Sequence, residues 1–263
     1  MASIAGQVAL ITGASSGIGE AIAWKFAEAG TKLILIARRS ERLNSLKTQL
    51  TEKFNAQVET VVLDMQDTSK LKQLPTNLPE GFQQVDILVN NAGLALGKAG
   101  LQQTSLEDIE TMVNTNVLAA SLLVRLFCNG MLDRNRGHII NISSIAAKQR
   151  YPGGGIYCGT KSYIDAFTEA IRHDFVNSNV KVTAVSPGAV QTEFSNVRYK
   201  GDDAAANATY EGMQPLLAAD IADQVLYAAT RPANVQIGEI ISYATTQASP
   251  WNVARPLADK SKA

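Results

Sequence analysis

Short runs of β-branched and aliphatic residues recur along the chain, and longer segments with the apolar spacing of a helix separate them. The pattern predicts about seven strands, which are Val8–Thr12, Lys32–Ile36, Gln57–Leu63, Ile87–Asn90, His138–Ile142, Lys181–Val185 and Glu239–Ser242. Parallel strands need crossover connections, which are right-handed and usually helical. The alternation therefore predicts an α/β fold with a parallel sheet and helices on both of its faces.

The alternation runs through all 263 residues, with neither an internal repeat nor a linker rich in proline, glycine or serine. A chain of this length forms one large domain or two small ones, and the pattern favours a single domain over residues 1–263. The least regular stretch, Gln191 to Ala206, is polar. This composition is typical of a mobile loop over a site, and equally of a solvated surface loop. Residues 191–215 are the candidate substrate loop.

The charge balance and the few cysteines and histidines limit which ligands and partners the chain is expected to bind. Basic and acidic residues number 24 each, so no overall field favours nucleic acid or a membrane surface. Cys128 and Cys158 lack metal-ligand spacing, and His138 and His173 stand alone, so we expect neither a metal site nor a disulfide. The first strand follows without a basic leader, and no stretch approaches the ~18 uncharged apolar residues of a membrane span. We expect a cytoplasmic protein.

A glycine-rich turn, Thr12-Gly-Ala-Ser-Ser-Gly-Ile-Gly19, joins the first predicted strand to a helix. Glycines here let the backbone approach a pyrophosphate, which the amides and the positive end of the helix dipole then hold. The spacing differs from G-x-G-x-x-G, and an ordinary tight turn uses the same residues. The order strand, turn, helix favours nucleotide binding, with candidate contacts at Gly13, Ser15, Ser16, Gly17, Ile18 and Gly19.

The end of the second predicted strand indicates which nucleotide binds. A site for NAD places an acidic residue there, whereas a site for NADP presents an arginine to the 2′-phosphate. Arg38 and Arg39 follow this strand, and no acidic residue ends it. A guanidinium matches phosphate geometry, so NADP(H) is favoured. Alternatively the arginines begin a solvated helix with Glu41 and Arg42, an interpretation that suits Arg39 better than Arg38.

Two further strand ends carry candidate cofactor contacts, because open α/β sheets bind ligands at the carboxyl ends of their strands. Asp64 ends the third strand and could accept a hydrogen bond from the adenine amino group. Asn91, Ala92 and Gly93 end the fourth, where small residues let the backbone lie close to the adenosine. Such clusters also make plain turns.

Tyr157 and Lys161 share one face of a predicted helix. With Ser144 they would form a proton-transfer site for carbonyl–alcohol chemistry, although such pairs are common on solvated helices. A free phenol has a pKa of about 10. A unit charge about 5 Å away, at an effective dielectric of about 20, contributes roughly 3 kcal/mol and would bring the pKa of Tyr157 to about 7 to 8.

Five motifs occur in order from about residue 7 onward, and together they make the chain resemble the short-chain dehydrogenase/reductase family. They are Thr12-Gly-x-x-x-Gly-x-Gly, Asn90-Asn-Ala-Gly, Ser144, Tyr157-x-x-x-Lys161 and Pro187-Gly188. The resemblance implies one doubly wound Rossmann domain that forms a homotetramer or dimer, of which we expect the homotetramer.

The resemblance also implies residue roles. Tyr157 would take the proton of a substrate hydroxyl, Ser144 would hold the substrate oxygen, and Lys161 would lower the phenol pKa and contact the cofactor ribose. Asn116 would hold a water in the proton relay. The segment that includes Pro187, Gly188, Val190 and Thr192 would close over the nicotinamide. Val190 would contact the carboxamide through its backbone, and Thr192 would bind the carboxamide or a phosphate. By pattern alone, a Pro-Gly turn also accounts for this segment.

A closer likeness, in Asn91–Gly97, Thr192–Asp203 and Thr246–Pro250, is to a branch of NADP-dependent 3-hydroxy acid dehydrogenases. Members oxidise serine, allo-threonine and related small acids such as 3-hydroxyisobutyrate, and some reduce ketones and aldehydes.

A substrate carboxylate needs a cation. Arg198 is the candidate, with Arg150 and Lys148 behind it, although by composition each is as well explained as a solvated charge. The alternatives are a ketone, aldehyde or 3-oxoacyl reductase of the same family and, from another class, a non-catalytic nucleotide-sensing regulator. An intact Ser144, Tyr157 and Lys161 set argues against the regulator.

Overall fold

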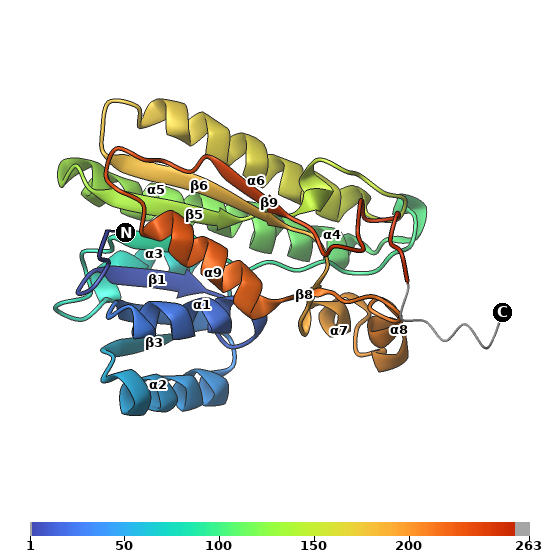
Figure 1. Ribbon diagram of the computed structural model, residues 1–263, viewed down its shortest axis with the longest axis horizontal. Helices are drawn as coiled ribbons and strands as arrows, with labels where there is room; N and C mark the ends of the chain where they lie inside the picture. Colours follow the sequence, from blue (N-terminus) through green and yellow to red (C-terminus); the bar gives the residue numbers. More distant parts are fainter. Residues whose placement is uncertain (1, 256–263) are drawn as a thin grey trace.

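The computed structural model describes residues 2–255. Seven strands form one sheet in the order β3-β2-β1-β4-β5-β6-β9, and each neighbouring pair is parallel (Figure 1). They are β1 (Val8–Thr12), β2 (Lys32–Ala37), β3 (Val58–Val62), β4 (Ile87–Asn90), β5 (Gly137–Ile142), β6 (Val180–Pro187) and β9 (Glu239–Ser242). The predicted single Rossmann-like α/β fold is confirmed, and the strand order reverses between β1 and β4, where such sheets bind ligands.

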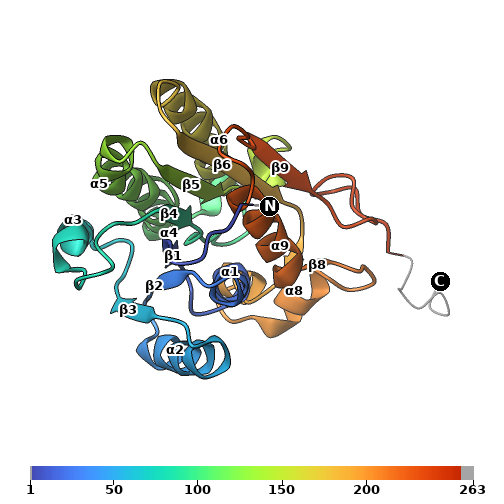
Figure 2. The ribbon, with the colours of Figure 1, turned by 60° about the vertical axis from the view of Figure 1, so that its left-hand side comes forward.

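Helices cover both faces of the sheet (Figure 2). One face carries α1 (Gly17–Glu28), α2 (Ser40–Phe54) and α9 (Ala218–Ala229), and the other carries α3 (Thr68–Asn77), α5 (Ala119–Asp133) and α6 (Gly155–Asp174). Each face has its own buried apolar cluster, with Phe26 of α1 in one and Met131 of α5 in the other. Because β1 and β2 are covered on both faces, their sequences are continuous apolar runs.

One long helical run consists of three successive elements. The short 3₁₀ turn Leu101–Gln103 precedes it, and the run itself consists of α4 (Leu106–Val113), a π-helical turn η2 (Asn114–Leu118) and α5. At 28 residues it is long and apolar enough to span a membrane by length and composition. Half of its most apolar window is buried, and α5 contributes to the core beneath the sheet. The buried half therefore accounts for its apolar composition.

The stretch predicted to be an irregular loop is instead partly ordered. It contains α7 (Phe194–Arg198) and α8 (Asp203–Ala208), and it is framed by a second, two-stranded parallel sheet of β7 (Val190–Gln191) and β8 (Leu216–Leu217). Asp202 caps α8 by accepting a hydrogen bond from the backbone amide of Ala205. The polar composition reflects caps and short helical turns, which periodicity cannot reveal in elements of five or six residues.

Candidate functional site

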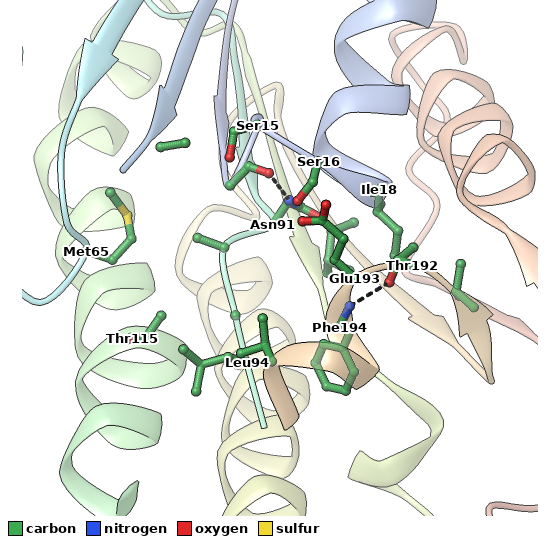
Figure 3. Close-up of a pocket in the computed structure, with 18 of the residues that line it drawn as sticks. Ser15, Ser16, Ile18, Met65, Asn91, Leu94, Thr115, Thr192, Glu193 and Phe194 are labelled. Carbon is green, nitrogen blue, oxygen red and sulfur yellow. Dashed lines mark hydrogen bonds between the residues drawn. The ribbon is translucent and has the colours of Figure 1, made fainter. Parts of the chain in front are cut away.

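A cavity of about 330 Å³ opens at the carboxyl ends of the strands, beside the point where the strand order reverses. Figure 3 shows the lining side chains converging from the β1–α1 turn, the end of β4 and the segment after β7. Most of the predicted site residues line it: Gly13, Ser15, Ser16, Gly17, Ile18, Arg38, Arg39, Asp64, Asn91, Ala92, Gly93, Ser144, Tyr157, Lys161, Pro187, Gly188, Val190 and Thr192. Gly19, Asn116 and Arg198 lie behind this lining.

The glycine-rich turn is fastened to the end of β4. The Thr12 hydroxyl accepts hydrogen bonds from the backbone amides of Asn91 and Ala92, at 3.0 and 2.9 Å, and the Asn91 side-chain amide donates to the Thr12 carbonyl at 2.8 Å. Gly13 has a φ of +66°, and a Cβ there would lie 2.9 Å from the Asn91 amide nitrogen. Only glycine fits this approach, which keeps the first turn of α1 open to a ligand.

Arg39 reaches from the end of β2 to this turn. Its guanidinium donates to the hydroxyl of Ser16 at 2.7 Å and to that of Ser15 at 3.2 Å. A third contact goes to the Glu193 carboxylate at 2.8 Å, which also accepts from Arg42 at 2.6 Å. The pKa of Glu193 is lowered, first of all by these two hydrogen bonds. Hydroxyls and guanidinium groups thus converge at one edge of the cavity.

Arg38 is placed differently. It is 62% exposed and lies 3.8 Å from the Asp64 carboxylate, which also accepts a hydrogen bond from the backbone amide of Gln66. Asp64 is on the cavity wall where an adenine contact was predicted. The sequence interpretation had ranked Arg38 above Arg39 as a phosphate ligand, yet Arg39 is the arginine that joins the serine hydroxyls.

The other end of the cavity is buried. Tyr157 and Lys161 lie on α6, and their exposed fractions are 8% and 6%. The Lys161 ammonium donates to the Ile142 carbonyl at 2.8 Å and lies 6.0 Å from the centre of the Tyr157 ring. Ser144 follows β5 and caps the short 3₁₀ turn Ile145–Ala147 by accepting from the Ala146 amide at 3.1 Å. The structure therefore brings the predicted serine, tyrosine and lysine to one wall.

Burial governs the ionisation of this pair. It raises the pKa of the Tyr157 phenol well above its usual value, and the opposing effects of a hydrogen bond from Ser144 and the charge of Arg198 are smaller. Burial also lowers the pKa of Lys161 to about 8. The expected fall in the Tyr157 pKa was therefore wrong for the protein alone, because the simple estimate counted the lysine charge but not desolvation.

Asn116 sits in the π-helical turn η2 and is buried. Its side-chain carbonyl accepts from the Leu94 amide at 2.9 Å, and its amide donates to the Leu94 carbonyl at 2.8 Å and the Thr160 hydroxyl at 3.0 Å. A Cβ on Gly93 would lie 3.3 Å from the Asn116 carbonyl oxygen and 3.4 Å from the Lys161 nitrogen. Asn116 thus ties the segment after β4 to α6, directly behind Lys161.

Arg198 of α7 is buried beside Tyr157, one of the predicted proton-transfer residues. Its guanidinium donates to the Gly97 carbonyl at 3.0 Å and the Tyr151 hydroxyl at 2.9 Å, and it lies 5.9 Å from the centre of the Tyr157 ring. The other two candidates for a substrate carboxylate, Lys148 and Arg150, have different surroundings. Lys148 is paired with Asp165 and Glu239, and Arg150 is exposed and bonded to the Lys148 carbonyl and the Ser162 hydroxyl.

The sequence interpretation missed several residues of this site. Glu193 lies on the cavity wall 154 positions from Arg39, and nothing in the local pattern marked it. Phe194 packs its ring 5.7 Å from that of Tyr157, and Tyr151 anchors Arg198. Among residues 2–255, no group of three or more histidine, cysteine, aspartate or glutamate side chains gathers as metal ligands do.

Comparison with known proteins gives a consistent result. A family model described as short chain dehydrogenase matches residues 7–203. The chain is 43% identical over 242 residues to the NADP-dependent 3-hydroxy acid dehydrogenase YdfG of Salmonella typhi, which covers 92% of this chain and 96% of the relative. It is 40% identical over 243 residues to sulfoacetaldehyde reductase 2 of Chromohalobacter salexigens, with the same coverage of 92% and 96%.

Among solved structures, the closed form of serine dehydrogenase complexed with NADP+ superimposes on this chain with a TM-score of 0.87. The two are 40% identical, and the match covers 92% of this chain and 96% of the other. The likeness thus extends over most of the length of both chains.

Proposed function

Because this chain belongs to the short-chain dehydrogenase/reductase family and is an NADP-dependent oxidoreductase acting on CH–OH groups, we propose that its substrates are small 3-hydroxy acids. Serine, allo-threonine and 3-hydroxyisobutyrate represent the class. The relatives named for 3-hydroxy acid and serine oxidation support this choice.

The buried guanidinium of Arg198 is the observation that carries the proposal. It is held beside Tyr157 by Gly97 and Tyr151, so the cation keeps its place without a carboxylate from the protein. In a 3-hydroxy acid, one intervening carbon separates the carboxylate from the carbinol carbon. A substrate that places its hydroxyl at Tyr157 would therefore bring its carboxylate toward Arg198.

The residues of the buried end would perform the proton transfer. Ser144 donates a hydrogen bond to the substrate oxygen, and Tyr157 takes the hydroxyl proton in oxidation and returns it in reduction. Lys161 holds its ammonium toward this end through the Ile142 carbonyl and stabilises the phenolate. Asn116 supports Lys161 from behind and would hold the relay water. When bound, NADP+ would supply the hydride acceptor and a positive charge that favours the phenolate.

The remaining predicted residues fit NADP(H). The open turn at Gly13 leaves the amides of α1 free for the pyrophosphate, and Ser15, Ser16 and Arg39 offer hydroxyls and a guanidinium to the 2′-phosphate. The other proposed cofactor contacts are Gly17, Ile18, Gly19, Arg38, Asp64, Asn91, Ala92, Gly93, Tyr157, Lys161, Pro187, Gly188, Val190 and Thr192.

Residues 191–215 form the proposed substrate loop within one domain of residues 1–263. The segment carries Phe194 and Arg198 against Tyr157, which would exclude water from the reacting carbon. We further propose a cytoplasmic homotetramer that binds small molecules and neither nucleic acid nor membrane. Size-exclusion chromatography with light scattering checks the oligomer.

A substrate panel tests the function. We expect NADP+ reduction with the three hydroxy acids, and little with neutral secondary alcohols of equal size. Arg198→Gln should raise KM for the hydroxy acids at least tenfold, with a smaller change for a neutral alcohol or ketone, and Arg150→Gln serves as the control. Turnover of neutral ketones only would contradict the proposal. Preferred reduction of sulfoacetaldehyde would favour the second candidate, an anionic-aldehyde reductase like the Chromohalobacter relative.

A further inference from the structure

The negatively charged carboxylate of Glu193 lies where the proposed phosphate-binding groups of the cavity converge. Its carboxylate accepts from Arg39 at 2.8 Å and from Arg42 at 2.6 Å. The same Arg39 guanidinium contacts the hydroxyls of Ser15 and Ser16. In Figure 3 the Glu193 carboxylate points toward Ser16, across the mouth of the turn that begins α1.

Four of the five N–H donors of the Arg39 guanidinium are used by these contacts. Its Nε, Nη1 and Nη2 atoms each donate to a protein oxygen, and the carboxylate takes Nη1. A phosphate that binds Arg39 through two parallel hydrogen bonds must therefore displace at least one existing partner. Glu193 is the partner that carries a charge and comes from a separate segment of the chain, whereas Ser15 and Ser16 belong to the turn itself.

The ion pairs are of the kind that a stronger anion displaces. The side chains of Arg39 and Glu193 are 42% and 43% exposed, and exposed pairs contribute little because water screens them. A phosphate monoester at neutral pH carries a charge near −2 and three acceptor oxygens, against −1 for the carboxylate. Binding of a 2′-phosphate would thus exchange a weak pair for a stronger one.

We propose that Glu193 is an internal competitor of the cofactor 2′-phosphate: it occupies the Arg39 guanidinium, weakens NADP(H) binding and thereby reduces the preference for NADP(H) over NAD(H). The proposal rests on the cofactor site assigned above. NAD(H) has a hydroxyl in place of the phosphate, so it leaves the Arg39–Glu193 pair intact and does not compete with the carboxylate.

The position of Glu193 links this competition to the substrate loop. Thr192 packs against Gly17, with its Cβ 3.2 Å from a Cβ built there, and Phe194 packs on Tyr157. Glu193 lies between these two contacts and is the N-terminal neighbour of α7, which carries Arg198. Displacement of Glu193 from Arg39 by the 2′-phosphate removes one of the two ties between the start of α7 and the arginines that follow β2, and the tie to Arg42 is the other.

The test measures cofactor binding by the whole chain without substrate. Dissociation constants of NADPH, NADH, 2′,5′-ADP and 5′-ADP are measured by calorimetry or fluorescence for wild type and Glu193→Gln. We expect the variant to bind NADPH and 2′,5′-ADP about threefold to tenfold more tightly, with NADH and 5′-ADP changed less than twofold. The salt dependence of NADPH affinity should become steeper, because one local negative charge is gone.

Glu59→Gln is the matched control, because it makes the same chemical change and removes an exposed pair with Lys47 away from the cavity. It should leave all four constants unchanged. Weaker NADPH binding by Glu193→Gln would overturn the proposal and make Glu193 a clamp over the cofactor. Equal changes for NADPH and NADH would also overturn it. Failure of wild type to bind NADPH at all would instead refute the cofactor site.

Discussion

The two ends of the cavity are built on different physical principles. At the proposed proton-transfer end, Tyr157 and Lys161 are buried, and Lys161 is held by a backbone carbonyl. At the phosphate end, Arg39 and Glu193 are nearly half exposed and held by side-chain pairs. Burial shifts pKa values at the first end, whereas water screens the charges at the second.

The difference matches what each end is proposed to do. Proton transfer needs groups whose pKa values and positions are set before substrate arrives, and burial sets both. Cofactor exchange needs an affinity that is strong but reversible, and exposed charged groups on movable side chains provide it. Substitutions should therefore change turnover at one end and cofactor selectivity at the other.

Tyr157→Phe should give the largest effect. It removes the proton donor and acceptor, and general acid–base catalysis contributes about 10²- to 10⁴-fold. We expect a loss of turnover of at least about 10²-fold, with NADPH affinity changed less than threefold, measured by steady-state kinetics and fluorescence titration. Retained turnover in the variant would reject the assigned role. A wild-type protein that binds NADPH but turns over no substrate would favour the nucleotide-sensing regulator.

Arg39→Gln should come next and act at the other end. A hydrogen bond to a charged group contributes about 1.5–3 kcal/mol, so the Kd of NADPH should rise about tenfold to a hundredfold while that of NADH changes little. Isothermal titration with both cofactors measures the difference. Parallel losses for both would show that Arg39 does not contact the 2′-phosphate.

The buried lysine should affect the pH dependence of stability. The folded pKa of Lys161 is about 8 against an ordinary 10.5, so between these values the unfolded chain binds more protons and stability rises with pH. From pH 7.5 to 9.5 wild type should gain about 1–2 kcal/mol more in unfolding free energy than Lys161→Met. Urea denaturation at the two pH values measures this, and identical profiles would contradict it.

Arg38→Gln should give the smallest effect. Arg38 is mostly exposed and its pair with Asp64 is 3.8 Å long, so such a contact contributes little. The Kd of NADPH should rise less than about threefold, well below the effect of Arg39→Gln in the same titration. A loss equal to that of Arg39→Gln would restore the ranking that the sequence suggested.

The sequence predicted elements that depend on periodicity and local turns. Six of the expected strands agree with the structure to within one residue at each end, and Gly13 stands where a positive φ is required. β6 extends to Pro187 because Ser186 and Pro187 pair with β9, a contact between distant segments. The order of the strands depends on such contacts, and the family resemblance indicated only that the domain is doubly wound.

Site residues were predictable where they form a motif and not where they meet only through the fold. Spacing made Tyr157 and Lys161 a candidate pair, with Ser144 upstream of them, and the family motifs distinguished this set from a common surface pair. Glu193 meets Arg39 only because β7 and α7 lie over the glycine-rich turn. The pKa of Tyr157 was misjudged for a related reason, since burial is a property of the assembled core and not of the helix that carries the residue.

The π-helical turn at Asn114–Leu118 also fixes the rotational phase of a long helix. Each residue of an α-helix advances the side chains by about 100°, and a π-turn accommodates one residue more than a regular turn does. The side chains of α4, upstream of the turn, and those of α5, downstream of it, therefore do not share one angular repeat. The turn sets the repeat with which α5 presents its apolar side to the sheet. Deleting one residue here would keep the helix intact but misalign Asn116 with Leu94 and Thr160, so chain length at this point is itself part of the site.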